Sequence, residues 1–286
     1  MGEIMKYKQY EPEVLKRLQN EELGILKDFI KICEKYDINY FVMYGTAIGA
    51  VRHNGFIPWD DDMDICMLRA DYEKFLEVAP QEVEGKYKIM GPDSEETYYN
   101  LVPNMNKIGT KFHTIYDRGK YDSGILIDIF PLDCVADDEK EKKKQIKKAK
   151  FWRELYILKN VNFYKLHQPG IKTKIKHIIC AIVHYALNIF GISGEFIYKQ
   201  HKKVAQKYNG KTNNVTSFVE YDAYETCMSI DDIFPLKKVK YDDIYVNIPN
   251  EYDKILTNRY GDYMELPKEE ERKNHYPYFL DFGDEK

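Results

Sequence analysis

Two aspartates separated by one residue are the first feature of this 286-residue sequence that could do chemistry. From Asp62 to Met67, carboxylate and apolar side chains alternate, which is the period-two pattern of a strand with one polar face. Asp62 and Asp64 are therefore expected on the same face. Two carboxylates held so close repel each other unless a cation lies between them, and oxygen ligands favour Mg²⁺ or Mn²⁺. The spacing predicts a divalent metal site.

A third carboxylate stands where an aspartate is rarely found. Asp128 is the one charged residue in the apolar run from Ile125 to Phe130, which predicts a buried strand. One interpretation is a core aspartate that is satisfied by hydrogen bonds. The other is a member of the same site as Asp62 and Asp64, since metal-assisted phosphoryl transfer needs a further carboxylate as a metal ligand or as a base. The three aspartates together favour the site.

A solvated acidic turn or a calcium loop is the alternative interpretation of the segment from Asp60 to Asp64. An EF-hand loop requires a glycine at its sixth position and a glutamate at its twelfth, whereas counting from Asp60 gives Ile65 and Asp71. The apolar residues between the aspartates also argue against a solvated turn. The calcium-loop interpretation is therefore rejected.

A glycine beside a hydroxyl residue precedes the aspartates. The apolar run from Tyr40 to Tyr44 predicts a short strand that stops at Gly45, and Thr46–His53 predicts a short helix after it. A glycine between a strand and a helix lets backbone N–H groups approach a phosphate with no side chain in the way. Tyr44, Gly45 and Thr46 are therefore predicted to form a phosphate-binding turn.

The surrounding elements predict an α+β fold, a mixed sheet flanked by helices. Strands and helices interleave through residues 1–135, which we interpret as the catalytic core. Residues 136–230 predict a helical subdomain for acceptor selection or membrane contact, and residues 231–286 predict a C-terminal segment that packs back on the core. Individual predicted elements are helices over 12–36, 71–79 and 250–260, two helices within 171–208, and strands over 87–90, 101–108, 111–116 and 125–130.

Composition excludes some partners. The net charge of -4 and the pI near 6.0 give no basic excess, so a nucleic-acid partner is not expected. The five cysteines are scattered, with no CxxC pair for zinc or redox chemistry, and residues 1–13 contain no apolar core of a secretory signal. These features together predict a cytoplasmic protein with reduced thiols.

One apolar stretch raises the question of a membrane. Ile178–Ile192 is shorter than the ~20 residues that span a bilayer, and His184 and Asn188 interrupt it. Three lysines just before it suit an interfacial helix on anionic lipid, with a buried core helix as the alternative: Lys172, Lys174 and Lys176. Peripheral contact with the inner face of the membrane is therefore a hypothesis.

The residues around the aspartates resemble the LicD family over a long and specific stretch. Tyr44-Gly45-Thr46 is followed by Gly49-Ala50-Val51-Arg52-His53, by Gly55-Phe56-Ile57-Pro58-Trp59-Asp60-Asp61-Asp62, and by Asp64. A second similarity runs from Ile127 to Asp133. A third and weaker one covers Tyr260–Met264 and then Leu266-Pro267, so the resemblance reaches both ends of the chain.

The resemblance implies a nucleotidyltransferase fold and the transfer of phosphocholine from CDP-choline to a sugar hydroxyl of a cell-surface glycan precursor. The acceptor would be a lipid-linked teichoic acid or lipopolysaccharide precursor, and CMP would leave. Relatives that use CDP-ribitol leave the transferred group open, as does true nucleotidyl transfer from a triphosphate. A non-catalytic sugar-binding protein ranks last, because Asp62, Asp64 and Asp128 are all present.

By the same resemblance Asp62 and Asp64 are the first metal ligands, and Asp128 is the third carboxylate, as a ligand or as the general base. Arg52 is a candidate phosphate contact through its planar guanidinium, with a surface ion pair as the alternative. His53 is a candidate hydrogen-bond donor, with capping of the short helix as the equal alternative.

Three further residues are candidates for substrate contact. Trp59 is the leading candidate for an aromatic face that holds the cationic choline group. Lys107 is a candidate phosphate contact, although a solvated lysine is the favoured interpretation. His275, in the C-terminal tail, is a candidate for reaching the site, with a solvated position as the alternative.

Overall fold

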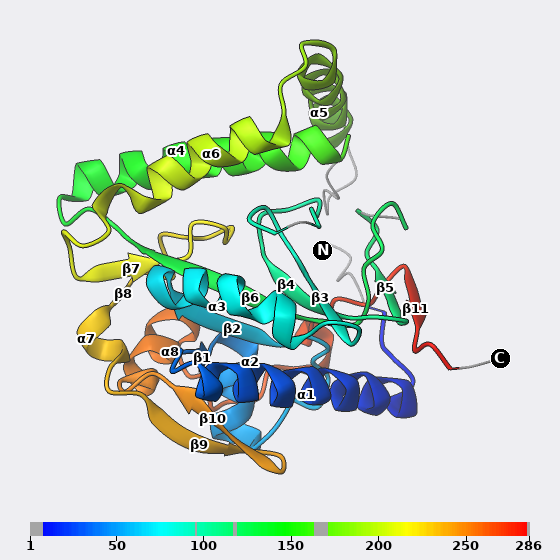
Figure 1. Cartoon of the computed structure of the whole chain (residues 1–286), viewed down its shortest axis with the longest axis vertical. Coiled ribbons are helices and arrows are strands. Elements are labelled where there is room, and N and C mark those ends of the chain that lie inside the picture. The colour runs from blue at the N-terminus through cyan, green and yellow to red at the C-terminus, as the bar shows by residue number, and fades with distance from the viewer. Residues whose placement is uncertain (1–7, 95, 117–118, 163–170, 285–286) are drawn as a thin grey trace.

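A computed structural model describes residues 8–94, 96–116, 119–162 and 171–284 (Figure 1). It confirms an α+β architecture, with a central mixed sheet, helices packed against it and a helical arm on one side. The elements are α1 (Pro12–Lys35), β1 (Phe41–Val42), α2 (Tyr44–Ile48), η1 (Gly49–His53), β2 (Asp64–Leu68), α3 (Arg69–Glu82), β3 (Tyr87–Met90), β4 (Asn104–Lys107), β5 (Lys111–His113), β6 (Leu126–Cys134), α4 (Glu139–Asn160), α5 (Ile171–Ile189), α6 (Gly194–Ala205), η2 (Gln206–Tyr208), β7 (Asn214–Thr216), β8 (Met228–Ser229), α7 (Ile230–Ile233), β9 (Lys237–Tyr241), β10 (Ile244–Ile248), α8 (Tyr252–Tyr260), η3 (Glu269–Glu271) and β11 (Phe279–Asp281).

The central sheet is built around β6, the longest strand. Its order is β1-β2-β6-β4-β3, and β7 pairs with the far end of β6. β2 and β6 run parallel, whereas β1 pairs with β2, and β4 with β6, in antiparallel fashion. The parallel pair places Asp64 opposite Asp128. Two residues that are far apart in the sequence therefore meet on neighbouring strands.

The two faces of this strand pair have different tasks. Ile65 on β2 and Ile127 and Ile129 on β6 are fully buried and pack in one cluster with the apolar side of α1. Successive side chains of a strand point to opposite faces, so Asp64 and Asp128 must point away from that cluster. The buried face anchors the strands, and the other face is free to carry the aspartates.

The long first helix, α1, packs against the buried face of β2 and β6. α1 begins with Pro12 in its first turn, where the missing N–H costs nothing, and buries Leu18, Leu26 and Phe29 completely. Gln19 on the same helix donates from Nε2 to the backbone oxygen of Asp60 at 2.9 Å. The helix therefore supports both the sheet and the acidic loop that leads into β2.

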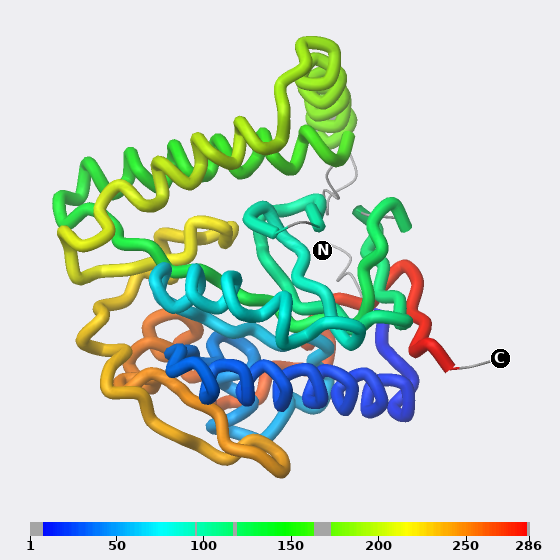
Figure 2. Tube along the Cα trace, viewed as in Figure 1, coloured from blue at the N-terminus to red at the C-terminus, as the bar shows by residue number. Residues whose placement is uncertain are grey.

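The helical arm comprises α4, α5 and α6. α4 and α6 lie side by side, and α5 projects from them (Figure 2). Asp138 caps α4 by accepting from the N–H groups of Lys140 and Glu141, and Ser193 caps α6 by accepting from the N–H of Phe196. Among the described residues no single helix is long and apolar enough to cross a membrane; only α5 and α6 taken together pass that test, with a bend of 109° between them.

Some elements differ from the sequence prediction. β2 begins at Asp64, so Asp62 lies in the loop before the strand rather than in it. The loop is tied there because Met63 accepts a backbone hydrogen bond from Asp128 at 2.8 Å. The short strands β7, β8 and β11 were not predicted. β7 joins the sheet, which brings the end of the 136–230 segment against the core.

Candidate active site

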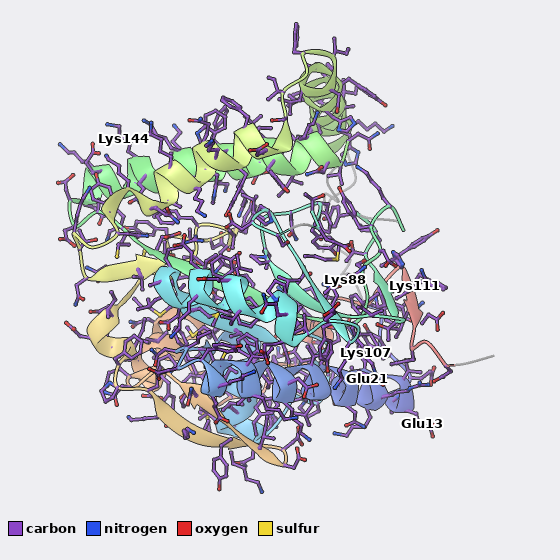
Figure 3. All side chains as sticks on the ribbon, in the orientation of Figure 1. Glu13, Glu21, Lys88, Lys107, Lys111 and Lys144 are labelled. Carbon is purple, nitrogen blue, oxygen red and sulfur yellow. The ribbon has the colours of Figure 1, made fainter. Side chains whose placement is uncertain are left out.

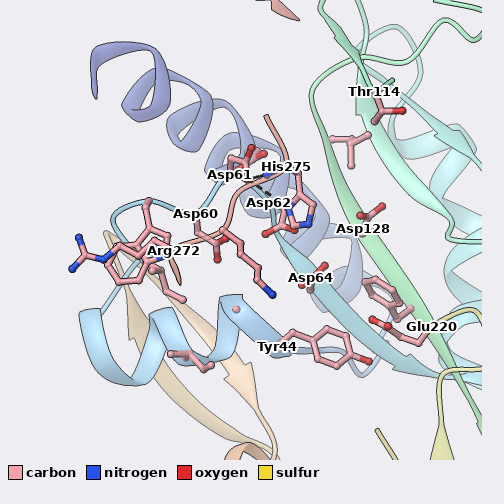
Figure 4. A pocket seen from close by; sticks show the side chains of 18 of the residues that line it. Tyr44, Asp60, Asp61, Asp62, Asp64, Thr114, Asp128, Glu220, Arg272 and His275 are labelled. Carbon is pink, nitrogen blue, oxygen red and sulfur yellow. Dashed lines mark hydrogen bonds and ion pairs between the residues drawn. The ribbon is translucent and has the colours of Figure 1, made fainter. Parts of the chain in front are cut away.

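A cavity of about 670 Å³ opens over the polar face of β2 and β6 (Figure 4). The acidic loop before β2, the start of α2, the end of α8 and the C-terminal tail form its other walls. The charged residues that line it are Glu22, Asp60, Asp61, Asp62, Asp64, Asp128, Glu220, Arg259, Glu271, Arg272, Lys273 and His275. The three aspartates predicted from the sequence all reach this one space.

Asp64 and Asp128 form the floor of the cavity. They are direct partners in the parallel pairing of β2 and β6, where strands lie ~4.8 Å apart, so both side chains leave the sheet on the same face. Burial, together with the charge of Asp62, raises the pKa of Asp128 to about 8. Burial and the neighbouring carboxylates also raise the pKa of Asp64 well above its ordinary value. The raised pKa values indicate that the cations of the protein do not balance these two carboxylates in their ionised form.

Asp62 has a cationic partner, His275. Nδ1 of His275 lies 3.0 Å from Oδ2 of Asp62, and this contact raises the pKa of the imidazole well above its ordinary value. Burial alone would raise the pKa of Asp62, but the charge of His275 and its hydrogen bond lower it. Burial and the Asp62 charge raise the pKa of Asp60. His275 thus acts as the counterion on the tail side of the cavity.

Asp61, between these two, holds the loop together. It is 1% exposed, and its two carboxylate oxygens accept from the Tyr10 hydroxyl at 2.6 Å and from the backbone N–H of His275 at 2.7 Å. The acidic loop is therefore fastened to the segment before α1 and to the C-terminal tail. Asp61 positions its neighbours.

The turn from β1 into α2 has a strained start. Tyr44 has a φ of 55°, a left-handed conformation that is costly for a tyrosine. A Cβ atom on Gly45 would lie 2.6 Å from Oδ2 of Asp60, so the glycine makes room for that carboxylate. The Thr46 hydroxyl accepts from the N–H of Asp64 at 2.8 Å and fixes the start of β2. Tyr44 and Gly45 line the cavity, whereas Thr46 supports it from behind.

The donor set suits a divalent cation, although the side chains do not surround one as they stand. Within the described ranges, no group of three or more His, Cys, Asp or Glu side chains is arranged to hold a metal ion. Asp62 is turned onto His275, which accounts for its not joining Asp64 and Asp128. A bound Mg²⁺ or Mn²⁺ would relieve the repulsion between these buried carboxylates, and both ions prefer oxygen ligands. The residues fit such an ion, and its binding stays a prediction.

Besides Thr46, three of the predicted contact residues lie outside this cavity. Arg52 donates from Nε to His53 at 2.9 Å and from Nη1 to the backbone oxygens of Tyr263 and Glu265. Lys107 pairs with Glu21 on α1 (Figure 3). Neither Arg52, His53 nor Lys107 lines the cavity. Their contact with substrate stays a prediction, and Arg52 has a structural task in holding the chain after α8.

Trp59 and His275 do line the cavity. The guanidinium carbon of Arg272 lies 4.3 Å from the centre of the Trp59 ring, so a cation already covers that aromatic face. A choline group could use Trp59 only if Arg272 moved. Tyr98 and Tyr99 provide a second aromatic wall, where Tyr99 stacks on Tyr116 at 5.6 Å between ring centres.

Sequence reasoning missed several charged residues of the cavity. Arg259, at the end of α8, stands directly before the Tyr260–Met264 motif, and this adjacency could have identified it. Its Nη1 is buried and finds no hydrogen-bond partner among the described residues. Glu220 comes from the loop between β7 and β8, and Arg272 and Lys273 come from the tail. No local pattern marks these three in the sequence.

An α+β sheet that presents clustered carboxylates to one cavity, together with a guanidinium that has one unpaired nitrogen, is typical of a transferase that handles phosphate groups. The model of the family described as LicD/FKTN/FKRP, nucleotidyltransferase domain, matches residues 37–169. A lipopolysaccharide cholinephosphotransferase, LicD, from Haemophilus influenzae is 30% identical over 260 residues, which cover 89% of this chain and 92% of the relative. An uncharacterized protein of Rickettsia typhi is 34% identical over 88 residues, 31% of this chain and 27% of the relative. The chain belongs to the LicD family, and it is a transferase of the LicD type.

Proposed function

We propose that this chain transfers phosphocholine from CDP-choline to a sugar hydroxyl of a lipopolysaccharide or teichoic-acid precursor and releases CMP. The observation that carries the proposal is the convergence of Asp62, Asp64 and Asp128 on one cavity. Similarity to a lipopolysaccharide cholinephosphotransferase along nearly the whole chain supports the choice of the transferred group. The same proposal assigns the central sheet to the nucleotidyltransferase fold.

The floor of the cavity would hold Mg²⁺ or Mn²⁺ between Asp64 and Asp128, with Asp62 joining when it turns away from His275. A cation bound there would neutralise negative charge on the phosphate oxygens of the donor. Asp128 would either complete that ligand set or accept the proton of the attacking sugar hydroxyl. The sugar oxygen forms the new bond to the phosphorus next to choline, and the bond between that phosphorus and the CMP oxygen breaks.

Arg259 is the residue that would bind a donor phosphate. Its guanidinium lies 4.6 Å from the centre of the Tyr44 ring, and Nε donates to the Tyr260 hydroxyl at 3.0 Å. These two contacts fix its plane, while the buried Nη1 has no partner in the described part of the chain. A buried donor without an acceptor is costly unless a ligand supplies one. Arg259 is thus pre-positioned for an anionic oxygen.

The choline end would lie against aromatic side chains near carboxylates, because a trimethylammonium group offers no hydrogen-bond donor. Tyr98 and Tyr99 line the cavity, and Glu220 adds negative charge on the wall beside Asp64. Trp59 is the alternative, provided that Arg272 leaves its face. The two aromatic positions can be separated by mutation.

The test is titration calorimetry with CDP-choline, CDP-ribitol and CTP, with and without Mg²⁺, followed by product analysis with an acceptor glycan. The wild type should prefer CDP-choline in the presence of Mg²⁺ and release CMP. Asp64→Asn should lose the Mg²⁺-dependent part of binding, and Arg259→Ala should weaken CDP-choline and CMP but not cytidine. Asp243→Asn, an exposed aspartate paired with Lys27, is the matched control.

The alternatives give different products. A preference for CDP-ribitol would keep the chemistry and replace the transferred group. Release of pyrophosphate from CTP would indicate nucleotidyl transfer instead. The absence of nucleotide binding under every condition would contradict the proposed function as a whole.

A further inference from the structure

α5 has two apolar faces, and α4 covers only one of them. Leu187 is buried on the inner face, and Cys180 and Val183 pack there against the cluster that contains Tyr156 and Leu158. His184 donates from Nδ1 to the backbone oxygen of Leu158 at 2.7 Å, and Lys159 donates to the side-chain oxygen of Asn188 at 2.7 Å. The polar residues that interrupt this stretch in the sequence are therefore fastened to α4 and do not interrupt the outer face.

The outer face is a continuous apolar stripe that no described residue covers. Its positions follow the helical spacing of three and four residues, and the exposed fractions reach 62% for Ile182 and 79% for Ile189 and Phe190. The stripe consists of Ile175, Ile178, Ile179, Ile182, Tyr185, Ile189 and Phe190. α5 projects from the rest of the arm (Figure 1).

The arm around the stripe is strongly basic. Residues 139–208 contain 17 lysines and arginines against four glutamates, a net charge of +13 in a chain whose total is -4. α5 itself has no acidic residue, and Lys174 and Lys176 are exposed beside the stripe. The side chain of Lys172 lies outside the described part of the structure. An anionic surface is the electrostatic complement of this arm.

We propose that α5 docks in the plane of an anionic lipid bilayer, with its isoleucine stripe among the acyl chains and its lysines at the headgroups. An exposed apolar helix face flanked by lysines is the pattern of interfacial helices. A second copy of the chain fits poorly as the occupant, since two arms of the same high charge repel each other. The inference rests on the geometry and charge of the arm and does not depend on the donor of the reaction.

The arm is joined to the wall of the cavity. Lys120 donates to the backbone oxygen of Asn160 at the end of α4, and its neighbour Tyr121 lies 5.6 Å, ring centre to ring centre, from Tyr98. Tyr98 lines the cavity. The loop that contacts the end of α4 therefore also contacts the aromatic wall of the cavity, and this loop connects the arm to the site.

The test is flotation of the full chain with vesicles of phosphatidylcholine and phosphatidylglycerol, and with vesicles of phosphatidylcholine alone. The wild type should float with the anionic vesicles, and raised salt should weaken this binding. The double variant Ile178→Ser/Ile182→Ser should bind at least about tenfold more weakly, because it removes two of the apolar anchors. Lys174→Glu/Lys176→Glu should also bind more weakly, by about fivefold for each lysine.

Tyr245→Ser is the matched control, since Tyr245 is 65% exposed on β10, away from the arm. It should float as the wild type does. Sedimentation and thermal unfolding of each variant check that it is folded and monomeric. Equal flotation of the wild type and both double variants would overturn the proposal, as would the absence of wild-type binding to anionic vesicles. A wild-type dimer that Ile178→Ser/Ile182→Ser abolishes would assign the stripe to a second copy instead.

Discussion

The cavity and the arm handle charge in opposite ways. The cavity gathers carboxylates on two paired strands and buries them, so that the pKa values of Asp64 and Asp128 rise. The arm spreads lysines over exposed helices and leaves an apolar stripe beside them. Outside residues 139–208 the chain carries a net charge of -17, against +13 within them. One region is arranged to receive a cation and the other to meet an anionic surface.

The two regions also differ in what they cost the folded state. Unbalanced buried carboxylates destabilise the protein, because the ionised form is poorly solvated there. An exposed apolar stripe costs little for folding, but it exposes the protein to association. Replacing a buried carboxylate of the cavity with a neutral residue should therefore raise the free energy of unfolding. Replacing residues of the apolar stripe should impair the function of the arm without lowering the free energy of unfolding. Mutations can test this contrast.

The largest effect is expected for Asp128→Asn. Transfer activity should fall by about a thousandfold, because the residue serves the reaction as ligand or base. The metal-free variant should nevertheless be more stable than the wild type at pH 7, by up to about 4 kcal/mol. The pKa of Asp128 is about 8 in the folded chain against 3.8 unfolded, so the unfolded chain loses its proton first and the wild type loses stability as the pH rises from 3.8 towards 8. Urea unfolding with a chelator present measures the difference.

The pH dependence provides the control for this prediction. Below the unfolded pKa both forms of the wild type are protonated, so the stability advantage of Asp128→Asn should vanish towards pH 3.8. Asp243→Asn, at an exposed ion pair, should leave both activity and stability nearly unchanged. If Asp128→Asn proved less stable than the wild type at pH 7, the contrast between the cavity and the arm would fail.

Local sequence patterns were sufficient for the elements that bury a long apolar face. α1 and the strand pair β2 and β6 were predicted because their side chains repeat with helical or strand period over several turns or positions. The convergence of Asp62, Asp64 and Asp128 was predicted from the same patterns and from family resemblance. These residues lie where regular elements end or pair, and such positions can be identified from a short stretch of sequence.

The missed features depend on partners far away in the chain. β7 and β11 have three residues each, too few for a period, and they form because β6 and β5 offer free edges. Glu220 reaches the cavity from an irregular loop. The contacts of Arg52, for which phosphate binding stays a prediction, include carbonyl groups of residues more than 200 positions later. Only the folded chain reveals such contacts.

A second and smaller effect is expected in the arm, at His201 on α6. Burial lowers the pKa of this histidine to about 4, and its Nε2 donates to the backbone oxygen of Phe218. Its neutral form stabilises the fold above pH 6.5, and this contribution is lost as the pH falls from 6.5 to 4. The loss should be about 3 kcal/mol. His201→Gln should flatten that part of the stability profile.

The comparison with Asp128→Asn sharpens this result, because the two stability profiles have opposite slopes. A fall in pH should lower the free energy of unfolding of the wild type through His201 in the arm. The same fall in pH should raise it through Asp128 in the cavity. His184, a less buried histidine on α5, gives the matched variant His184→Gln. If His184→Gln and His201→Gln flattened the profile equally, burial of His201 would not be the cause.

The smallest effect separates a buried support of the cavity from a similar contact at the surface. The Tyr10 hydroxyl donates to the buried Asp61, so Tyr10→Phe leaves a carboxylate oxygen without its partner and should cost about 2 kcal/mol of unfolding free energy. Tyr36→Phe is the control, because the Tyr36 hydroxyl donates to Glu82 at an exposed site, where water replaces it. That change should cost less than about 1 kcal/mol. Urea unfolding of both variants measures the two losses. Equal losses would mean that the acidic loop does not depend on its buried donor. The predicted difference would show that neutral groups outside the cavity hold its carboxylates in place.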